Sequence, residues 1–162
     1  MKIAMVLQAY ESIAFERFST MIKKNGHSCR FFFDPALFSD YSLDIPLLNR
    51  IFSLNIRNLT GKIIDYSPDL VFFTVYTENL NWVSNTAALI KKENPNIQIV
   101  CGGPHCTCSP SGLTDNPNID KVIRGSGDDY LDSLLRESEY DNKSWSACIT
   151  DTYKDIKEDK EE

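Results

Sequence analysis

The stretch that decides the fold is Val100-Cys101-Gly102-Gly103-Pro104-His105, and Val122-Ile123-Arg124-Gly125-Ser126-Gly127-Asp128 repeats its pattern further along the chain. In each stretch a short apolar run ends in glycines and then in polar residues. Such a pattern is typical of a buried parallel strand that ends at the edge of a sheet. Glycine there permits a positive φ and lets a ligand approach the backbone without meeting a Cβ. Two such strand ends predict a binding crevice along one edge of an open α/β sheet.

Strand-like apolar runs alternate with helical patterns on both sides of these stretches. The expected strands are residues 3–7, 29–33, 70–75, 97–101 and 121–124. Ser12 can cap a first helix, Asn79 or Asn81 a later one, and Asp128 with Asp129 can open the last helix, whose dipole their carboxylates complement. This order predicts an α/β fold: a doubly wound, five-stranded parallel sheet, flavodoxin-like, with strand order 2-1-3-4-5.

Two regions are less regular. Between residues 36 and 58, Asp44 followed by Pro46 could start a helix, and Gly61 is expected to break or bend it. After Arg136 the pattern decays: residues 145–149 could add one edge strand, and residues 154–162 form a charge-dense tail. We therefore expect a binding domain over residues 1–140. Residues 141–162 are expected to be an edge segment and charged tail, or the start of a linker to a missing domain.

Composition restricts the class of partner. A chain of 162 residues is one domain by the usual size prior. Its net charge of −6 argues against nucleic acid, whose binders concentrate Lys and Arg on one face. No apolar run is long enough to span a bilayer, and the N-terminus does not have the pattern of a signal peptide. Five cysteines, an odd number, then suggest reduced thiols and a cytoplasmic location.

Three familiar uses of this architecture do not match the strand ends. A dinucleotide-binding domain has G-x-G-x-x-G after the first strand, and a flavodoxin has a Ser/Thr/Gly-rich phosphate loop there, whereas residues 7–12 read Leu-Gln-Ala-Tyr-Glu-Ser. A phospho-receiver domain needs an aspartate at the end of the third strand and a lysine at the end of the fifth. This chain has Thr74-Val75-Tyr76 and Arg124-Gly125 at those places.

A fourth use matches. From Thr74–Asn79 through Gly102-Gly103-Pro104-His105-Cys106-Thr107 to Gly125-Ser126-Gly127-Asp128, the chain resembles the N-terminal cobalamin-binding domain of cobalamin-dependent radical S-adenosylmethionine enzymes. In that family the fourth strand ends in Gly-Gly-x-His-x-Thr and the fifth in Gly-Glu-Gly-Glu. The resemblance covers about residues 1–137. Ser126 and Asp128 depart from the family pattern, and Ser126 loses the acidic group.

The resemblance implies that residues 1–140 are a cobalamin-binding, Rossmann-like domain, with cobalamin over the carboxyl edge of the sheet and its nucleotide tail in the crevice. The first strand-to-helix turn lacks the Asp-x-His-x-x-Gly motif of histidine-ligating corrinoid domains, so a base-off cobalamin without a histidine ligand is expected. No catalytic residue and no metal-ligating residue is assigned. The residues expected to contact the cofactor are Gln8, Ala9, Tyr10, Thr74, Val75, Tyr76, Thr77, Asn79, Gly102, Gly103, Pro104, His105, Gly125, Ser126 and Gly127.

The function that this resemblance implies is that of a cobalamin-binding module, in an enzyme that performs methyl transfer or related radical chemistry. The chain has no Cys-x3-Cys-x2-Cys motif, so S-adenosylmethionine and the [4Fe–4S] cluster are expected in a missing catalytic domain in cis. No nucleic-acid or membrane partner is expected. The alternative is a stand-alone sensor or protein-interaction domain that has lost the cofactor, which Ser126 and the acidic tail favour.

Several single residues carry narrower expectations. His105 is expected to make a polar contact with the cofactor and not to ligate cobalt, whereas His27, at the amino end of the sheet, is expected to be structural. Cys101 is expected to be a small buried residue. Gly103→Val is expected to abolish binding and leave the fold largely intact; if Gly103 is merely a turn residue, the fold suffers first.

Overall fold

A computed structural model describes residues 1–9, 12–36, 39–40, 43–44, 56–136 and 149–151. The strands of its main sheet are β1 (Lys2–Gln8), β2 (Ser28–Asp34), β5 (Leu70–Thr74), β6 (Gln98–Gly102), β7 (Lys121–Arg124) and β8 (Ile149–Asp151). A separate antiparallel pair is formed by β3 (Ser39–Asp40) and β4 (Leu43–Asp44). The helices are α1 (Ile13–Lys24), α3 (Ile56–Tyr66), α4 (Leu80–Glu93), α5 (Pro104–Cys108), α6 (Ser111–Thr114) and α7 (Gly127–Arg136).

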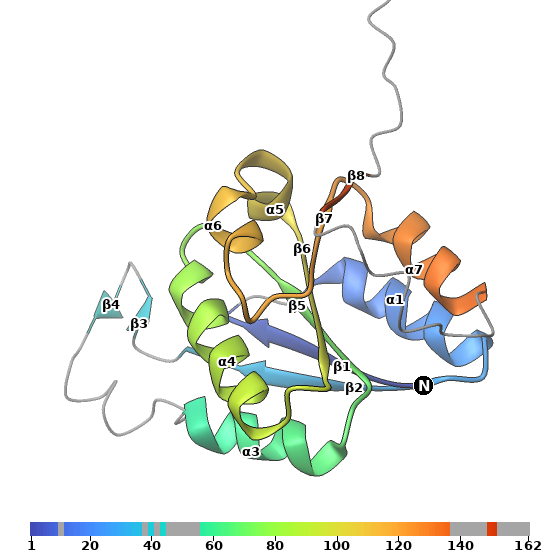
Figure 1. Cartoon of the computed structure of the whole chain (residues 1–162), viewed down its shortest axis with the longest axis horizontal. Coiled ribbons are helices and arrows are strands. Elements are labelled where there is room, and N and C mark those ends of the chain that lie inside the picture. Colours follow the sequence, from blue (N-terminus) through green and yellow to red (C-terminus); the bar gives the residue numbers. More distant parts are fainter. Residues whose placement is uncertain (10–11, 37–38, 41–42, 45–55, 137–148, 152–162) are drawn as a thin grey trace, which may run out of the picture.

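The main sheet is six-stranded and entirely parallel, in the order β2-β1-β5-β6-β7-β8 (Figure 1). The first five strands in this order confirm the predicted order 2-1-3-4-5. The sixth, β8, pairs with β7 and overlaps the expected edge strand only at Ile149. Residues 145–148, the rest of that expected strand, lie outside the described residues.

Helices cover both faces of this sheet, α1 and α7 on one and α3 and α4 on the other (Figure 1). The sheet therefore has two cores. Phe15, Phe18 and Ile22 of α1 repeat at helical spacing and pack with Leu131 of α7 on the first face. On the second face, Ile63 of α3 packs with the apolar side of α4. Burial on both faces explains why β5 is apolar and buried throughout, without the alternation of a half-exposed strand.

Two local expectations are corrected. Gly61 does not break a helix, because it lies inside α3, which continues to Tyr66. The helix expected to begin after Asp44 would start within residues 45–55, which lie outside the described residues. Within the described residues, no helix has both the length and the apolar character needed to cross a membrane.

Candidate functional site

The strand ends that the sequence singled out meet at one edge of the sheet. Thr74 at the end of β5 is level with Gly102 at the end of β6, and Cys101 of β6 is level with Val122 of β7. Beyond these ends lies a cavity of about 270 Å³. It is lined by Ser12, Ala14, Phe15, Phe18, Phe72, Thr74, Tyr76, Gly102, Gly103, Pro104, Ile123, Gly125, Ser126, Gly127 and Asp128.

The inner wall of this edge cavity is aromatic. Phe15 and Phe18 come from α1, and both rings meet the Phe72 ring of β5 edge to face, with centroids 5.6 and 5.5 Å apart. Ile123 of β7 completes the apolar wall. Edge-to-face packing holds the rings in fixed orientations. The inner end of the cavity therefore suits a flat, apolar group.

The rim of the cavity is bare backbone, but its glycines are also required by the fold itself. Gly103 has φ +112° and ψ −175°, a region that side chains rarely adopt. A Cβ built on Gly103 would lie 3.0 Å from both the backbone N and O of Val75, and not in open space. This corrects the expectation that Gly103→Val would spare the fold. The structure places the added side chain against the β5–α4 connection.

That connection, residues 75–79, is held in shape by Asn79. Asn79 is buried; its Oδ1 accepts from the Tyr76 backbone N–H at 2.9 Å, and its Nδ2 donates to the Thr74 backbone oxygen at 3.2 Å. It occupies the N-cap position of α4 without a side-chain bond to the helix. The predicted cap is therefore in place, but its side chain fixes the wall of the cavity.

Thr107 joins the two glycine-rich strand ends. Its Oγ1 donates to the Gly103 backbone oxygen at 3.2 Å and accepts from the Gly125 backbone N–H at 3.0 Å. Thr107 is the last position of the Gly-Gly-x-His-x-Thr pattern, yet it was not among the predicted contact residues. Its place in that pattern was the signal that could have found it, because the side chain fixes the spacing between the β6 and β7 ends.

The charged corner of the cavity lies where α1 meets α7. The Ser126 hydroxyl accepts from the Asp128 backbone N–H at 3.3 Å and donates to Asp128 Oδ2 at 3.2 Å. Asp128 Oδ2 also pairs with Arg17 Nη2 at 3.2 Å. The other carboxylate oxygen, Oδ1, is buried and has no hydrogen-bond partner among the described residues. Ser126 thus caps α7 and orients Asp128 in place of presenting a carboxylate of its own.

About half of the predicted contact residues line the cavity. Those that line it are Thr74, Tyr76, Gly102, Gly103, Pro104, Gly125, Ser126 and Gly127. Gln8, Ala9, Val75, Thr77, Asn79 and His105 do not line it, and Tyr10 lies outside the described residues. The lining residues that sequence reasoning missed are mostly apolar, and their periodic spacing indicated only the core.

The two histidines lie at opposite edges of the sheet. His105 Nδ1 is 3.1 Å from the hydroxyl of Thr77, so the imidazole ties α5 to the β5–α4 connection. His27 precedes β2, and its Nδ1 lies 3.3 Å from the Met1 amine at the amino end of the strands. In the first strand-to-helix turn, Ala9 has φ +63°, and its N–H donates to the Asp34 backbone oxygen at 2.9 Å.

Two cysteines near the site, Cys101 and Cys106, are buried thiols. Cys101 is buried in β6, as expected, and burial raises its pKa well above the ordinary value. Burial likewise raises the pKa of Cys106 to about 12. Because the thiolate is the reactive and metal-binding form, neither side chain is available for nucleophilic chemistry at neutral pH. Within the part of the chain that the structure describes, no three His, Cys, Asp or Glu side chains cluster as metal ligands.

Comparison with known proteins points to one ligand class. Residues 36–135 match the family described as "B12 binding domain". A cobalamin-dependent radical SAM methyltransferase, TokK of Streptomyces tokunonensis, is 28% identical over 81 residues, which cover 49% of this chain and 12% of that protein. An anaerobic magnesium-protoporphyrin IX monomethyl ester cyclase of Rubrivivax gelatinosus is 35% identical over 75 residues, covering 46% and 14%. The chain spans 20% or less of the length of these and the other curated relatives it matches.

A solved structure shares the architecture. The CheY-like protein tadZ of Pseudomonas aeruginosa superposes with a TM-score of 0.55 at 10% identity, over 85% of this chain and 93% of that chain. Such a likeness shows the fold alone. Thr74-Val75-Tyr76 and Arg124-Gly125 stand in this chain where a phospho-receiver has an aspartate and a lysine.

Proposed function

The chain belongs to the B12-binding domain family, and on that premise we propose that it is the cobalamin-binding module of a radical S-adenosylmethionine enzyme. The observation that carries the proposal is the edge cavity, which is lined by Gly102 and Gly103 at the end of β6, by residues 125–127 after β7, and by an aromatic wall. Relatives named as a radical SAM methyltransferase and as a cyclase support such a parent enzyme and leave its reaction open.

The residues present suit the nucleotide tail of cobalamin. The tail ends in a flat, apolar base, which the rings of Phe15, Phe18 and Phe72 would contact, and its sugar and phosphate would pass the bare backbone of the rim. Asp128 lines the cavity, and its buried Oδ1, which has no hydrogen-bond partner among the described residues, would accept from a hydroxyl of the sugar. The corrin ring would then lie over the carboxyl ends of the strands.

Bound cobalamin would supply a cobalt centre able to carry a methyl group. The chain's own residues would bind and orient it. We propose a base-off state without a histidine ligand, because residues 8–11 contain no histidine and His105 is engaged by Thr77. Gln8 and Ala9, at the carboxyl end of β1, would contact the corrin, and Tyr10 stays a predicted contact that lies outside the described residues.

We also propose that S-adenosylmethionine and a [4Fe–4S] cluster belong to a catalytic domain in cis, of which this chain contains no cluster motif. The binding domain would occupy residues 1–140. Residues 141–162 would lead toward the catalytic domain after contributing β8 to the sheet edge. A domain that had lost its cofactor is the alternative, and a binding measurement separates the two.

A substitution at an exposed position that lines the cavity tests the proposal. Ala14 lies on α1, is exposed and lines the cavity, so Ala14→Phe adds a ring at its mouth without disturbing the core. Hydroxocobalamin should bind the wild-type chain in the micromolar range, and Ala14→Phe should weaken binding by at least about tenfold. Ala14→Ser, the matched control, should bind as the wild type does. Absence of both a spectral change and a heat of binding at millimolar cobalamin would contradict the proposal.

A second ligand locates the tail. Cobinamide lacks the nucleotide, so its affinity should be lower than that of cobalamin and should not change in Ala14→Phe. If Ala14→Phe weakened cobinamide and cobalamin equally, the tail would not occupy this cavity. Circular dichroism on both variants establishes that the fold is retained.

A further inference from the structure

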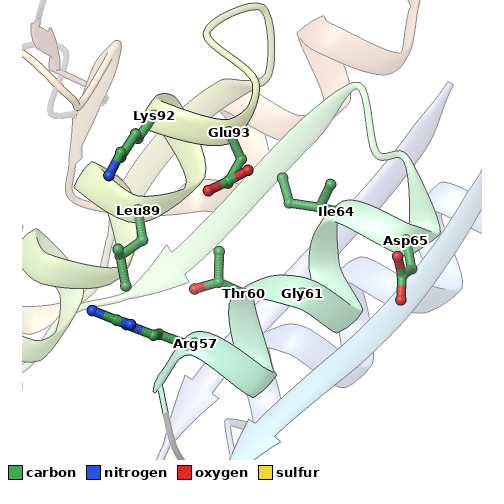
Figure 2. A pocket seen from close by; sticks show the side chains of 8 residues that line it. All are labelled: Arg57, Thr60, Gly61, Ile64, Asp65, Leu89, Lys92 and Glu93. Atoms are coloured by element: carbon green, nitrogen blue, oxygen red, sulfur yellow. The ribbon is translucent and has the colours of Figure 1, made fainter.

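A second hollow lies on the other face of the sheet, between α3 and α4 (Figure 2). Its volume is about 380 Å³, larger than that of the edge cavity. It is lined by Arg57, Thr60, Gly61, Ile64 and Asp65 of α3 and by Leu89, Lys92 and Glu93 of α4. None of these residues lines the edge cavity, and α3 and α4 lie on the opposite side of the sheet from α1 and α7. The α3–α4 groove is therefore independent of the proposed cofactor site.

Gly61 is the unusual residue of this groove. It lies in the middle of α3, where glycine costs about 0.5–1 kcal/mol relative to alanine. A Cβ built on Gly61 would meet nothing within 4 Å among the described residues, and its φ is not positive. Neither helix geometry nor packing against the described residues therefore requires glycine here. Glycine at this exposed position does allow the backbone of another molecule to approach closely.

The charges around Gly61 are arranged symmetrically. Arg57 precedes Gly61 by four residues and Asp65 follows it by four, so all three share one face of α3. Figure 2 shows Arg57 and Asp65 toward opposite ends of the helix, with Gly61 between them. If a second α3 crossed antiparallel at Gly61, each Arg57 would face the Asp65 of the other copy. A two-fold axis thus converts one helix face into a surface complementary to itself.

The α4 side of the groove adds apolar surface and charges of both signs. Ile64 and Leu89 are only half-buried, and Lys92 and Glu93 are exposed at the rim. Two half-buried apolar side chains with charged residues around them match the apolar centre and polar rim of an interface between two chains.

We propose that two copies of this chain associate through the α3–α4 groove, with their α3 helices crossing antiparallel at Gly61. Glycine at the crossing lets the helix backbones approach closely, and Ile64 and Leu89 of each copy pack beside it. The Arg57–Asp65 pairs then fix the register. The pairing uses one surface patch on both copies, so the assembly closes as a dimer.

Sedimentation equilibrium on the full chain tests the proposal. The wild type should be dimeric with a dissociation constant below about 0.1 mM. Gly61→Arg should raise that constant at least tenfold, because it places two long cations at the two-fold axis. Gly112→Arg is the matched control: Gly112 is an exposed glycine of α6, and its built Cβ has only an ordinary contact, 3.8 Å from Leu80 Cδ2. It should dimerise as the wild type does.

A charge swap tests the antiparallel register. Arg57→Asp alone, or Asp65→Arg alone, sets like charges opposite each other and should weaken the dimer. The double variant restores opposite charges and should recover most of the wild-type association, whereas Lys23→Asp on α1 should have no effect. A monomeric wild type at about 1 mM, an unaffected Gly61→Arg dimer, or a double variant weaker than both single variants would each overturn the proposal. Thermal melts of every variant show whether its chain is folded.

Discussion

Gly103→Ala should destabilise this domain more than a glycine substitution at an ordinary turn. Gly103 has φ +112° and ψ −175°, where a non-glycine residue carries about 1–3 kcal/mol of strain. Its new Cβ would lie 3.0 Å from the Val75 backbone N and O. Those two atoms make hydrogen bonds to the Gly102 oxygen at 2.8 Å and from the His105 N–H at 3.1 Å. Displacing them weakens both, at about 1 kcal/mol each.

The total expected loss is therefore about 3–5 kcal/mol in the free energy of unfolding, measured by urea denaturation followed by circular dichroism. For a chain of this size that corresponds to roughly 6–20 °C in Tm. Gly26→Ala is the matched control. Gly26 also has a positive φ, +77°, but its built Cβ meets no described residue within 4 Å, so that variant should lose only about 1 kcal/mol. Equal losses in the two variants would refute the contact with Val75.

Three further outcomes are expected. His105→Ala should lower the free energy of unfolding by about 1 kcal/mol, because the contact to Thr77 is lost. The electron paramagnetic resonance spectrum of bound cob(II)alamin should not change in this variant. Loss of nitrogen hyperfine splitting would instead show that His105 ligates cobalt. Asn79→Asp should cost about 2–3 kcal/mol in urea unfolding, because the buried amide donor to Thr74 is lost, whereas a neutral effect would contradict its bridging role. Raising the pH from about 9 toward 12 should progressively lower the free energy of unfolding, because the folded state keeps the Cys106 proton up to about pH 12 whereas the unfolded chain releases it near the ordinary pKa of 9.0. Below about pH 9 the stability contributed by this thiol is fully present. A free energy of unfolding that did not change between about pH 9 and 12 would contradict the raised pKa.

The sequence predicts the sheet well because its strands are buried on both faces. Continuous runs such as Leu70–Thr74 and Lys121–Arg124 are bounded by polar or glycine residues, so both their existence and their order follow from the pattern. Gly61 shows the limit of such reasoning. A glycine usually marks a helix end, but here the apolar contacts of Leu59 and Ile63 with the core extend α3 past it.

The sequence predicts the backbone rim of the candidate site but not the side chains that form its walls. Gly102, Gly103 and Gly125 are visible in the sequence because glycine itself is the signal. Phe15, Phe18 and Phe72 have the spacing of ordinary core residues, and nothing local distinguishes a ring that faces a cavity from one that faces another ring. The role of Gly103 also depends on Val75, a residue of the β5–α4 connection, so the conflict between them becomes visible only once β5 and β6 lie side by side.

The pairing of β1 with β5 has a consequence for how the chain assembles. β1 and β2 are joined through α1, and β5 and β6 through α4, so each pair can form from nearby segments. The β1–β5 ladder instead pairs Ile3 with Leu70. These two residues are more than twice as far apart along the chain as Leu70 and Gln98, which pair in the β5–β6 ladder. Loop-closure entropy therefore makes the β1–β5 ladder the costliest of these three pairings to form.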